Sequence, residues 1–89
     1  MSMIVKYEVH VECINTLDHI MDKMKGLGLD LKIKLETWGL KMMILKKGSD
    51  MFIDVDVMLK CEKDGKYTYE FGVRDEEGFK KLLEILNRI

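Results

Sequence analysis

The chain has 89 residues, of which 47% are hydrophobic and 35% charged, and its formal net charge is −1. This length suits a single domain over residues 1–89, and the balanced charge argues against a dedicated nucleic-acid binder, which usually carries a basic excess. No apolar run approaches the ~18 residues needed to span a membrane, and the first residues lack the layout of a signal peptide.

Cysteine usage indicates the cellular compartment, and charged-residue usage bears on the growth temperature. Cys13 and Cys61 lie far apart in the sequence and form no disulfide framework, so we expect reduced thiols and a cytoplasmic protein. The charges are mainly Lys, Glu and Asp, and the chain contains no Gln. This usage is similar to that of thermophilic proteins, although eight Met residues argue against it.

The first half of the chain predicts a strand followed by a helix. Residues 3–12 alternate between apolar and polar side chains, and this period of two indicates a half-buried strand. Apolar residues then recur at helical spacing from Leu17 to Leu27, which predicts a helix that Gly26 and Gly28 end.

The second half predicts four strands and a final helix. The strands are expected over 31–37, 40–47, 51–62 and 67–73. Asp75 is placed to cap the helix. The apolar stripe of this helix is Phe79, Leu82, Leu83, Leu86 and Ile89.

The registers follow from matching inward-facing residues across each hairpin, because a slip of one residue would turn core side chains to solvent. The predicted partners are Glu36 with Lys41, Ile44 with Ile53, Leu45 with Phe52, Val57 with Phe71, Cys61 with Tyr67 and Asp54 with Arg74. The turns that these registers require are Trp38-Gly39, Gly48-Ser49 and a three-residue bulged turn, Lys63-Asp64-Gly65, with Gly65 left-handed.

The element order β-α-β-β-β-β-α indicates an α+β fold, a five-stranded antiparallel sheet with two helices on its apolar face. Hairpins place the last four strands side by side, and we expect the first strand to join beside the fifth. In element order and length the chain resembles one repeat of the TATA-box-binding protein and a minimal helix-grip fold. The resemblance covers the whole chain as topology, rests on no shared motif and carries no function by itself.

Two acidic residues invite a catalytic or metal-binding interpretation, since Asp54 and Asp56 point to the same face of one strand. The predicted registers place Arg74 across from Asp54 and Lys41 across from Asp56, which favours an exposed face of charge pairs. A catalytic carboxylate needs a sheltered site, and the sequence indicates none.

Metal and enzyme motifs are otherwise sparse. His10, Cys13 and His19 are possible zinc ligands within ten residues, but they are predicted to point in different directions. The glycines form no phosphate-binding loop, and no triad of nucleophile and base is suggested by position. We therefore expect no metal, no cofactor and no enzymatic activity.

Large apolar side chains are expected on the outer face of the sheet, away from the helices. Acidic residues on the same face would repel the phosphates of a nucleic acid. They are Trp38, Met43, Leu45, Phe52 and Met58. An apolar group edged by charges is typical of an association surface. We expect a non-enzymatic protein–protein interaction module, a homodimer or other homo-oligomer that associates through this face and binds neither nucleic acid nor membrane.

The alternative is a small carrier of apolar ligands, because helix-grip proteins hold such ligands between the sheet and the last helix. The residues that would line this space are Tyr67, Tyr69, Phe71, Phe79, Leu83 and Leu86. Side chains of this size more often fill a core than surround a cavity.

Overall fold

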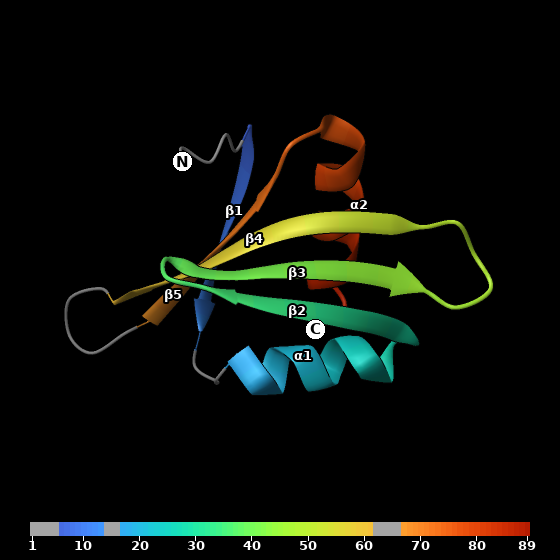
Figure 1. Cartoon of the computed structure of the whole chain (residues 1–89). Helices are drawn as coiled ribbons and strands as arrows, with labels where there is room; N and C mark the ends of the chain where they lie inside the picture. Colours follow the sequence, from blue (N-terminus) through green and yellow to red (C-terminus); the bar gives the residue numbers. More distant parts are fainter. Residues whose placement is uncertain (1–5, 14–16, 62–66) are drawn as a thin grey trace.

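The computed structural model describes residues 6–13, 17–61 and 67–89, which form five strands and two helices (Figure 1). The strands are β1 (Tyr7–Cys13), β2 (Leu29–Glu36), β3 (Gly39–Lys46), β4 (Phe52–Cys61) and β5 (Tyr67–Val73). The helices are α1 (Leu17–Gly26) and α2 (Glu76–Leu86). The predicted α+β class and element order are confirmed.

The five strands make one antiparallel sheet in the order β1-β5-β4-β3-β2. Hairpins join β2, β3, β4 and β5 in succession, and β1 pairs with β5 from Tyr7–Val73 to Cys13–Tyr67, as predicted. Among the described strands, β1 and β2 are therefore the two edges of the sheet (Figure 1).

Both helices pack against one face of the sheet, the inner face, because their buried side chains join a single apolar cluster with the strands. Its members are Ile20, Met24, Leu29, Leu40, Met42, Ile44, Ile53, Val55, Val57, Tyr69, Phe71, Val73, Leu82 and Ile85. At one end, Tyr7 stacks on Phe79 with ring centroids 5.2 Å apart, which ties β1 to α2. Neither α1 nor α2 is long and apolar enough to cross a membrane.

Two of the three predicted hairpin registers are confirmed. Ile44 lies opposite Ile53 in the β3–β4 pair, and Val57 lies opposite Phe71 in the β4–β5 pair. Long alternation on β4 and β5 sets the inward faces of these two strands, and a slip of one residue would turn core side chains to solvent. The bulged turn expected over 63–65 lies outside the described residues.

The register of β2 against β3 differs from the prediction by two residues. Glu36 lies opposite Gly39 rather than Lys41, so that Thr37-Trp38 forms the turn. A glycine suits this paired position, because a Cβ on Gly39 would collide with the backbone carbonyl oxygen of Val57 on β4. The glycine is needed inside the sheet, where the neighbouring strand approaches closely, and not in the turn.

The start of α2 accounts for a glycine inside a helix. Asp75 caps the helix as predicted, and its Oδ1 accepts a 2.6 Å hydrogen bond from the backbone N–H of Gly78. A Cβ on Gly78 would lie 3.0 Å from that same oxygen. Gly78 therefore leaves room for a close cap, which offsets its poor helix propensity.

Candidate functional site

Three of the predicted association residues come together on the outer face of the sheet, opposite the helices. Leu45 of β3 and Phe52 of β4 are direct cross-strand partners, and Met43 is the next residue of β3 on the same face. Phe52 is 50% exposed, and the other two are half-buried. We call these residues, Met43, Leu45 and Phe52, the outer-face patch.

The other two predicted association residues lie away from this patch. Met58 is six residues from Phe52 along β4, which corresponds to roughly 20 Å of strand. Trp38 lies in the turn between β2 and β3, and both residues are half-buried. The five predicted residues therefore divide between the two ends of one face.

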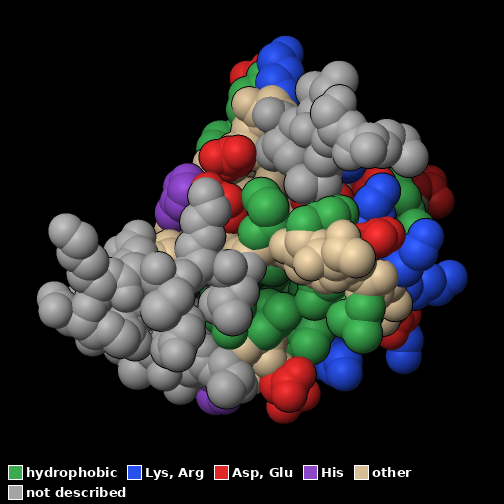
Figure 2. Space-filling view, turned by 60° about the vertical axis from the view of Figure 1, so that its left-hand side comes forward, with side chains coloured by type: hydrophobic (Ala, Val, Ile, Leu, Met, Phe, Trp, Pro, Cys, Tyr) green, Lys and Arg blue, Asp and Glu red, His purple; other side chains and the backbone are tan. Residues whose placement is uncertain are grey.

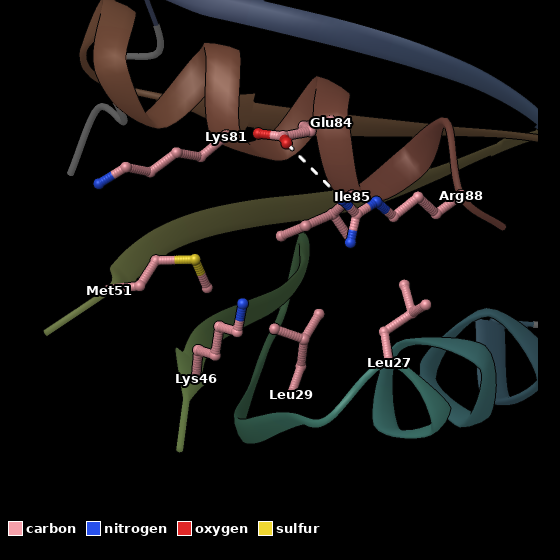
Figure 3. A pocket seen from close by; sticks show the side chains of 8 residues that line it. All are labelled: Leu27, Leu29, Lys46, Met51, Lys81, Glu84, Ile85 and Arg88. Carbon is pink, nitrogen blue, oxygen red and sulfur yellow. Dashed lines mark ion pairs between the residues drawn. The ribbon is translucent and has the colours of Figure 1, made fainter. Parts of the chain in front are cut away.

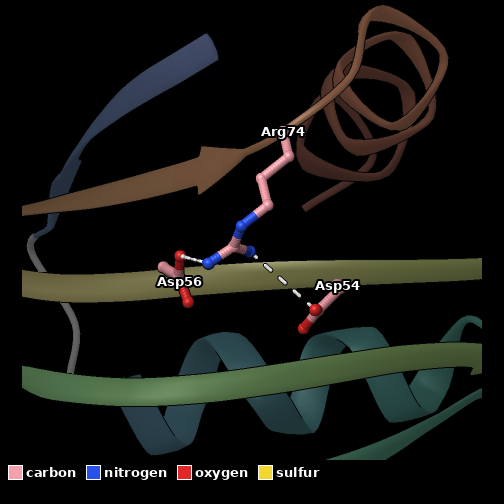
Figure 4. Close-up of polar contacts among 3 residues, drawn as sticks. All are labelled: Asp54, Asp56 and Arg74. Atoms are coloured by element: carbon pink, nitrogen blue, oxygen red, sulfur yellow. Dashed lines mark hydrogen bonds and ion pairs between the residues drawn. The ribbon is translucent and has the colours of Figure 1, made fainter. Parts of the chain in front are cut away.

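Between these ends the outer face holds a charge cluster (Figure 4). One Nη of Arg74 is 2.8 Å from Oδ2 of Asp56, and the other is 3.8 Å from Oδ2 of Asp54. The predicted neighbourhood of Asp54 and Arg74 is thus present, but Arg74 makes its closer contact with Asp56.

The expectation of a fully solvated outer face is wrong for the centre of the sheet. Asp56 is only 1% exposed, and its Oδ1 is buried without a hydrogen-bond partner. Thr68 and Glu70, on neighbouring β5, are also buried. Alternation distinguishes the two faces of a strand, but it carries no information on how deeply the side chains of the second face are enclosed.

His10 lies between two carboxylates at the β1–β5 pair. Its Nε2 is 3.6 Å from Oε2 of Glu8 and 3.6 Å from Oε1 of Glu70, which is its partner across the strands. In Figure 2 a histidine is seen against acidic side chains. The ligand atoms of these three residues lie within 4.8 Å of one another, so they are the described residues able to share a metal ion.

This cluster differs from the possible zinc ligands His10, Cys13 and His19, which were predicted to point in different directions. His19 is exposed on α1, and the side chain of Cys13 is not described. Glu8 and Glu70 were missed as neighbours of His10, although the sequence held a signal, since two residues along a strand and one directly across share a face.

The residues proposed to line a ligand cavity lie largely in the core. Phe71 is fully buried, Tyr69 is 7% exposed, and Phe79 stacks on Tyr7. A hollow of about 110 Å³ does lie beside α2 (Figure 3). It is lined by other residues, Leu27, Leu29, Lys46, Met51, Lys81, Glu84, Ile85 and Arg88. This hollow is smaller than a usual ligand pocket of about 300–1,000 Å³. A larger hollow of about 280 Å³ lies between β4 and the start of α2, but charged residues, among them Asp54, Arg74 and Lys81, line it.

Sequence reasoning missed the most exposed apolar side chain of the described chain, Leu35, which is 80% exposed. Leu35 and Ile33 alternate with Lys32, Lys34 and Glu36 along the sequence, a pattern that assigns them to the inner face of their strand. They do lie on that face, opposite Leu40 and Met42, but Ile33 is 41% exposed. The signal was in the lengths, because a ten-residue helix is about 15 Å long and an eight-residue strand about 26 Å.

The chain was compared with family models, curated proteins and solved structures. No family model, curated protein or solved structure matches the chain.

Proposed function

We propose that this chain is a non-enzymatic interaction module that self-associates through the outer face of its sheet. The observation that carries the proposal is the outer-face patch, in which a half-exposed phenylalanine lies directly across from Leu45 and beside Met43. Interface cores typically contain large apolar side chains of this kind, which contact their own sheet and are also exposed to solvent.

Charges next to the patch favour a partner with the same surface. Asp54 lies opposite Met43, and it shares Arg74 with the buried Asp56. A face that presents both an acidic and a basic group can meet a second copy, rotated by a two-fold axis, with opposite charges in contact. Two sheets packed in this way would have the arrangement of a β-sandwich, about 10 Å apart.

The apolar-ligand carrier is the weaker proposal. It draws on the likeness to a minimal helix-grip fold, and Phe71 and Tyr69 fill with side-chain atoms the space that a ligand would occupy. The hollow beside α2 has charged groups at its rim, Lys46, Lys81 and Arg88, which suit an apolar ligand poorly.

Sedimentation velocity over a range of protein concentrations tests the proposal. We expect the natural chain to show concentration-dependent association that Phe52→Asp weakens, because the substitution places a charge in the patch. Ile89→Asp is the matched control, since Ile89 is a similarly exposed apolar residue, 43% exposed, three residues beyond the end of α2. Equal association of the natural chain and Phe52→Asp would contradict the proposal.

A further inference from the structure

The edge strand β2 has an unusual combination of an open side and exposed apolar residues. It pairs with β3 on one side, and none of the described strands pairs with its other side. Leu35 and Ile33 stand 80% and 41% exposed on its inner face. Natural edge strands are usually short, charged or covered, because an open edge templates pairing with another chain. The charges of β2 lie on its outer face, so its inner face at Ile33 and Leu35 is apolar and uncovered.

The exposed part of β2 is the part that α1 leaves uncovered. In Figure 1 the strand runs past the beginning of the helix at the end where the β2–β3 turn lies. Leu29, at the other end of the strand, is buried, and Leu31 is half-buried. Figure 2, which brings the turn end of the sheet forward, shows hydrophobic side chains reaching the surface there.

The backbone of this edge is suited to accept a further strand. Glu36 and Gly39 close the two-residue turn, and the pair that closes such a turn is hydrogen-bonded. Backbone groups of even-numbered β2 residues therefore point to β3, and those of Ile33 and Leu35 point outward. These outward N–H and C=O groups can pair with an added strand.

We propose that β2 pairs antiparallel with β2 of a second copy, about a two-fold axis that passes beside Lys34. In this register Ile33 of each copy lies opposite Leu35 of the other, so the most exposed apolar side chains cover one another. On the outer face Lys32 lies opposite Glu36 of the second copy, twice, which gives two opposite-charge pairs. Only Lys34 meets its own counterpart.

Two registers shifted toward the start of β2 are less favourable. An axis beside Ile33 would place Lys32 opposite Lys34 and Asp30 opposite Glu36, which are four like-charge contacts in the symmetric pair. An axis beside Lys32 would place Leu35 opposite Leu29, where α1 already covers the strand. Charge and helix position therefore both favour the axis beside Lys34 over these two registers.

This contact joins two sheets into a continuous ten-stranded sheet whose outer faces lie on the same side. It gives the interaction module a function beyond the one proposed above, because one dimer would present two outer-face patches to its partners. The edge contact uses none of the patch residues, so either contact can fail while the other remains.

Cysteine cross-linking tests the register. In a chain with Cys13→Ser and Cys61→Ser, Lys34→Cys places two thiols across a non-hydrogen-bonded pair, with Cα atoms about 4.5 Å apart, within disulfide range. Lys32→Cys is the matched control on the same face, with its two thiols about 13 Å apart along the strands. We expect Lys34→Cys to form covalent dimers at least about tenfold faster. Equal rates in the two variants would overturn the register.

A charge exchange keeps the proposal testable if the cysteine-free chain does not fold. Under reducing conditions, Lys32→Glu and Glu36→Lys should each weaken dimerisation about tenfold, and the double variant should restore it. The measurement is sedimentation in the Phe52→Asp chain, in which the outer-face contact is absent. A double variant as weak as the singles, or a Phe52→Asp chain that stays monomeric throughout, would overturn the proposal. Loss of association in the charge variants alone would leave the outer-face proposal intact.

Discussion

Removal of Arg74 should destabilise the domain more than its surface position suggests. Its guanidinium is the charged partner of Asp56, a carboxylate that is 1% exposed and has one oxygen without a hydrogen bond. Arg74→Met leaves that carboxylate buried and unpaired. The loss of one partner from a fully buried ion pair costs about 3–5 kcal/mol.

The cost here should lie below that range, because the Arg74 side chain is 40% exposed and water already screens it. We expect Arg74→Met to lower the free energy of unfolding by about 2–3 kcal/mol, out of a total of roughly 4–13 kcal/mol for a chain of this length. The corresponding fall in Tm is about 10–20 °C.

Urea unfolding followed by circular dichroism measures this effect. Asp54→Asn is the matched control, since Asp54 is 47% exposed and 3.8 Å from the same guanidinium, and it should cost less than about 0.5 kcal/mol. Adding Asp56→Asn to Arg74→Met should recover about 1 kcal/mol or more, because it removes the buried charge. The reasoning is refuted if Arg74→Met costs no more than Asp54→Asn.

Three further predictions concern backbone positions, each measured by the same unfolding assay. Gly39→Ala should cost about 2 kcal/mol or more, because its Cβ would meet the carbonyl of Val57. This cost should exceed that of Gly28→Ala, where φ is +83° but the space is open; a reversed order would show that β3 can move away from β4. Asp75→Ala should cost about 1 kcal/mol through loss of the helix cap; no change would mean that the cap is dispensable. Gly65→Val should cost about 1 kcal/mol or more if the turn is bulged as the register requires; a harmless Gly65→Val would argue for another turn.

Sequence alone determined the elements whose physical cause is local or periodic. The long alternation on β4 and β5 specified their inward faces and, through parity, the pairing of Val57 with Phe71. Asp75 was predicted to cap α2 because an aspartate at this position can accept a hydrogen bond from a backbone N–H of the first helical turn. The order of β2, β3, β4 and β5 followed because three short hairpins join them in succession.

Tertiary structure alone decided what depends on distances between elements. The register of β2 against β3 places Gly39 inside the sheet, where it lies against the backbone of Val57 on β4, and alternation in the sequence does not indicate this close approach. The burial of Asp56 also depends on side chains from several strands, and alternation marks its face but not its depth. Leu35 follows an inner-face pattern and is nevertheless exposed, because α1 is shorter than the strand beside it. A pattern assigns a residue to a face, whereas the reach of the opposing element decides whether that face is covered.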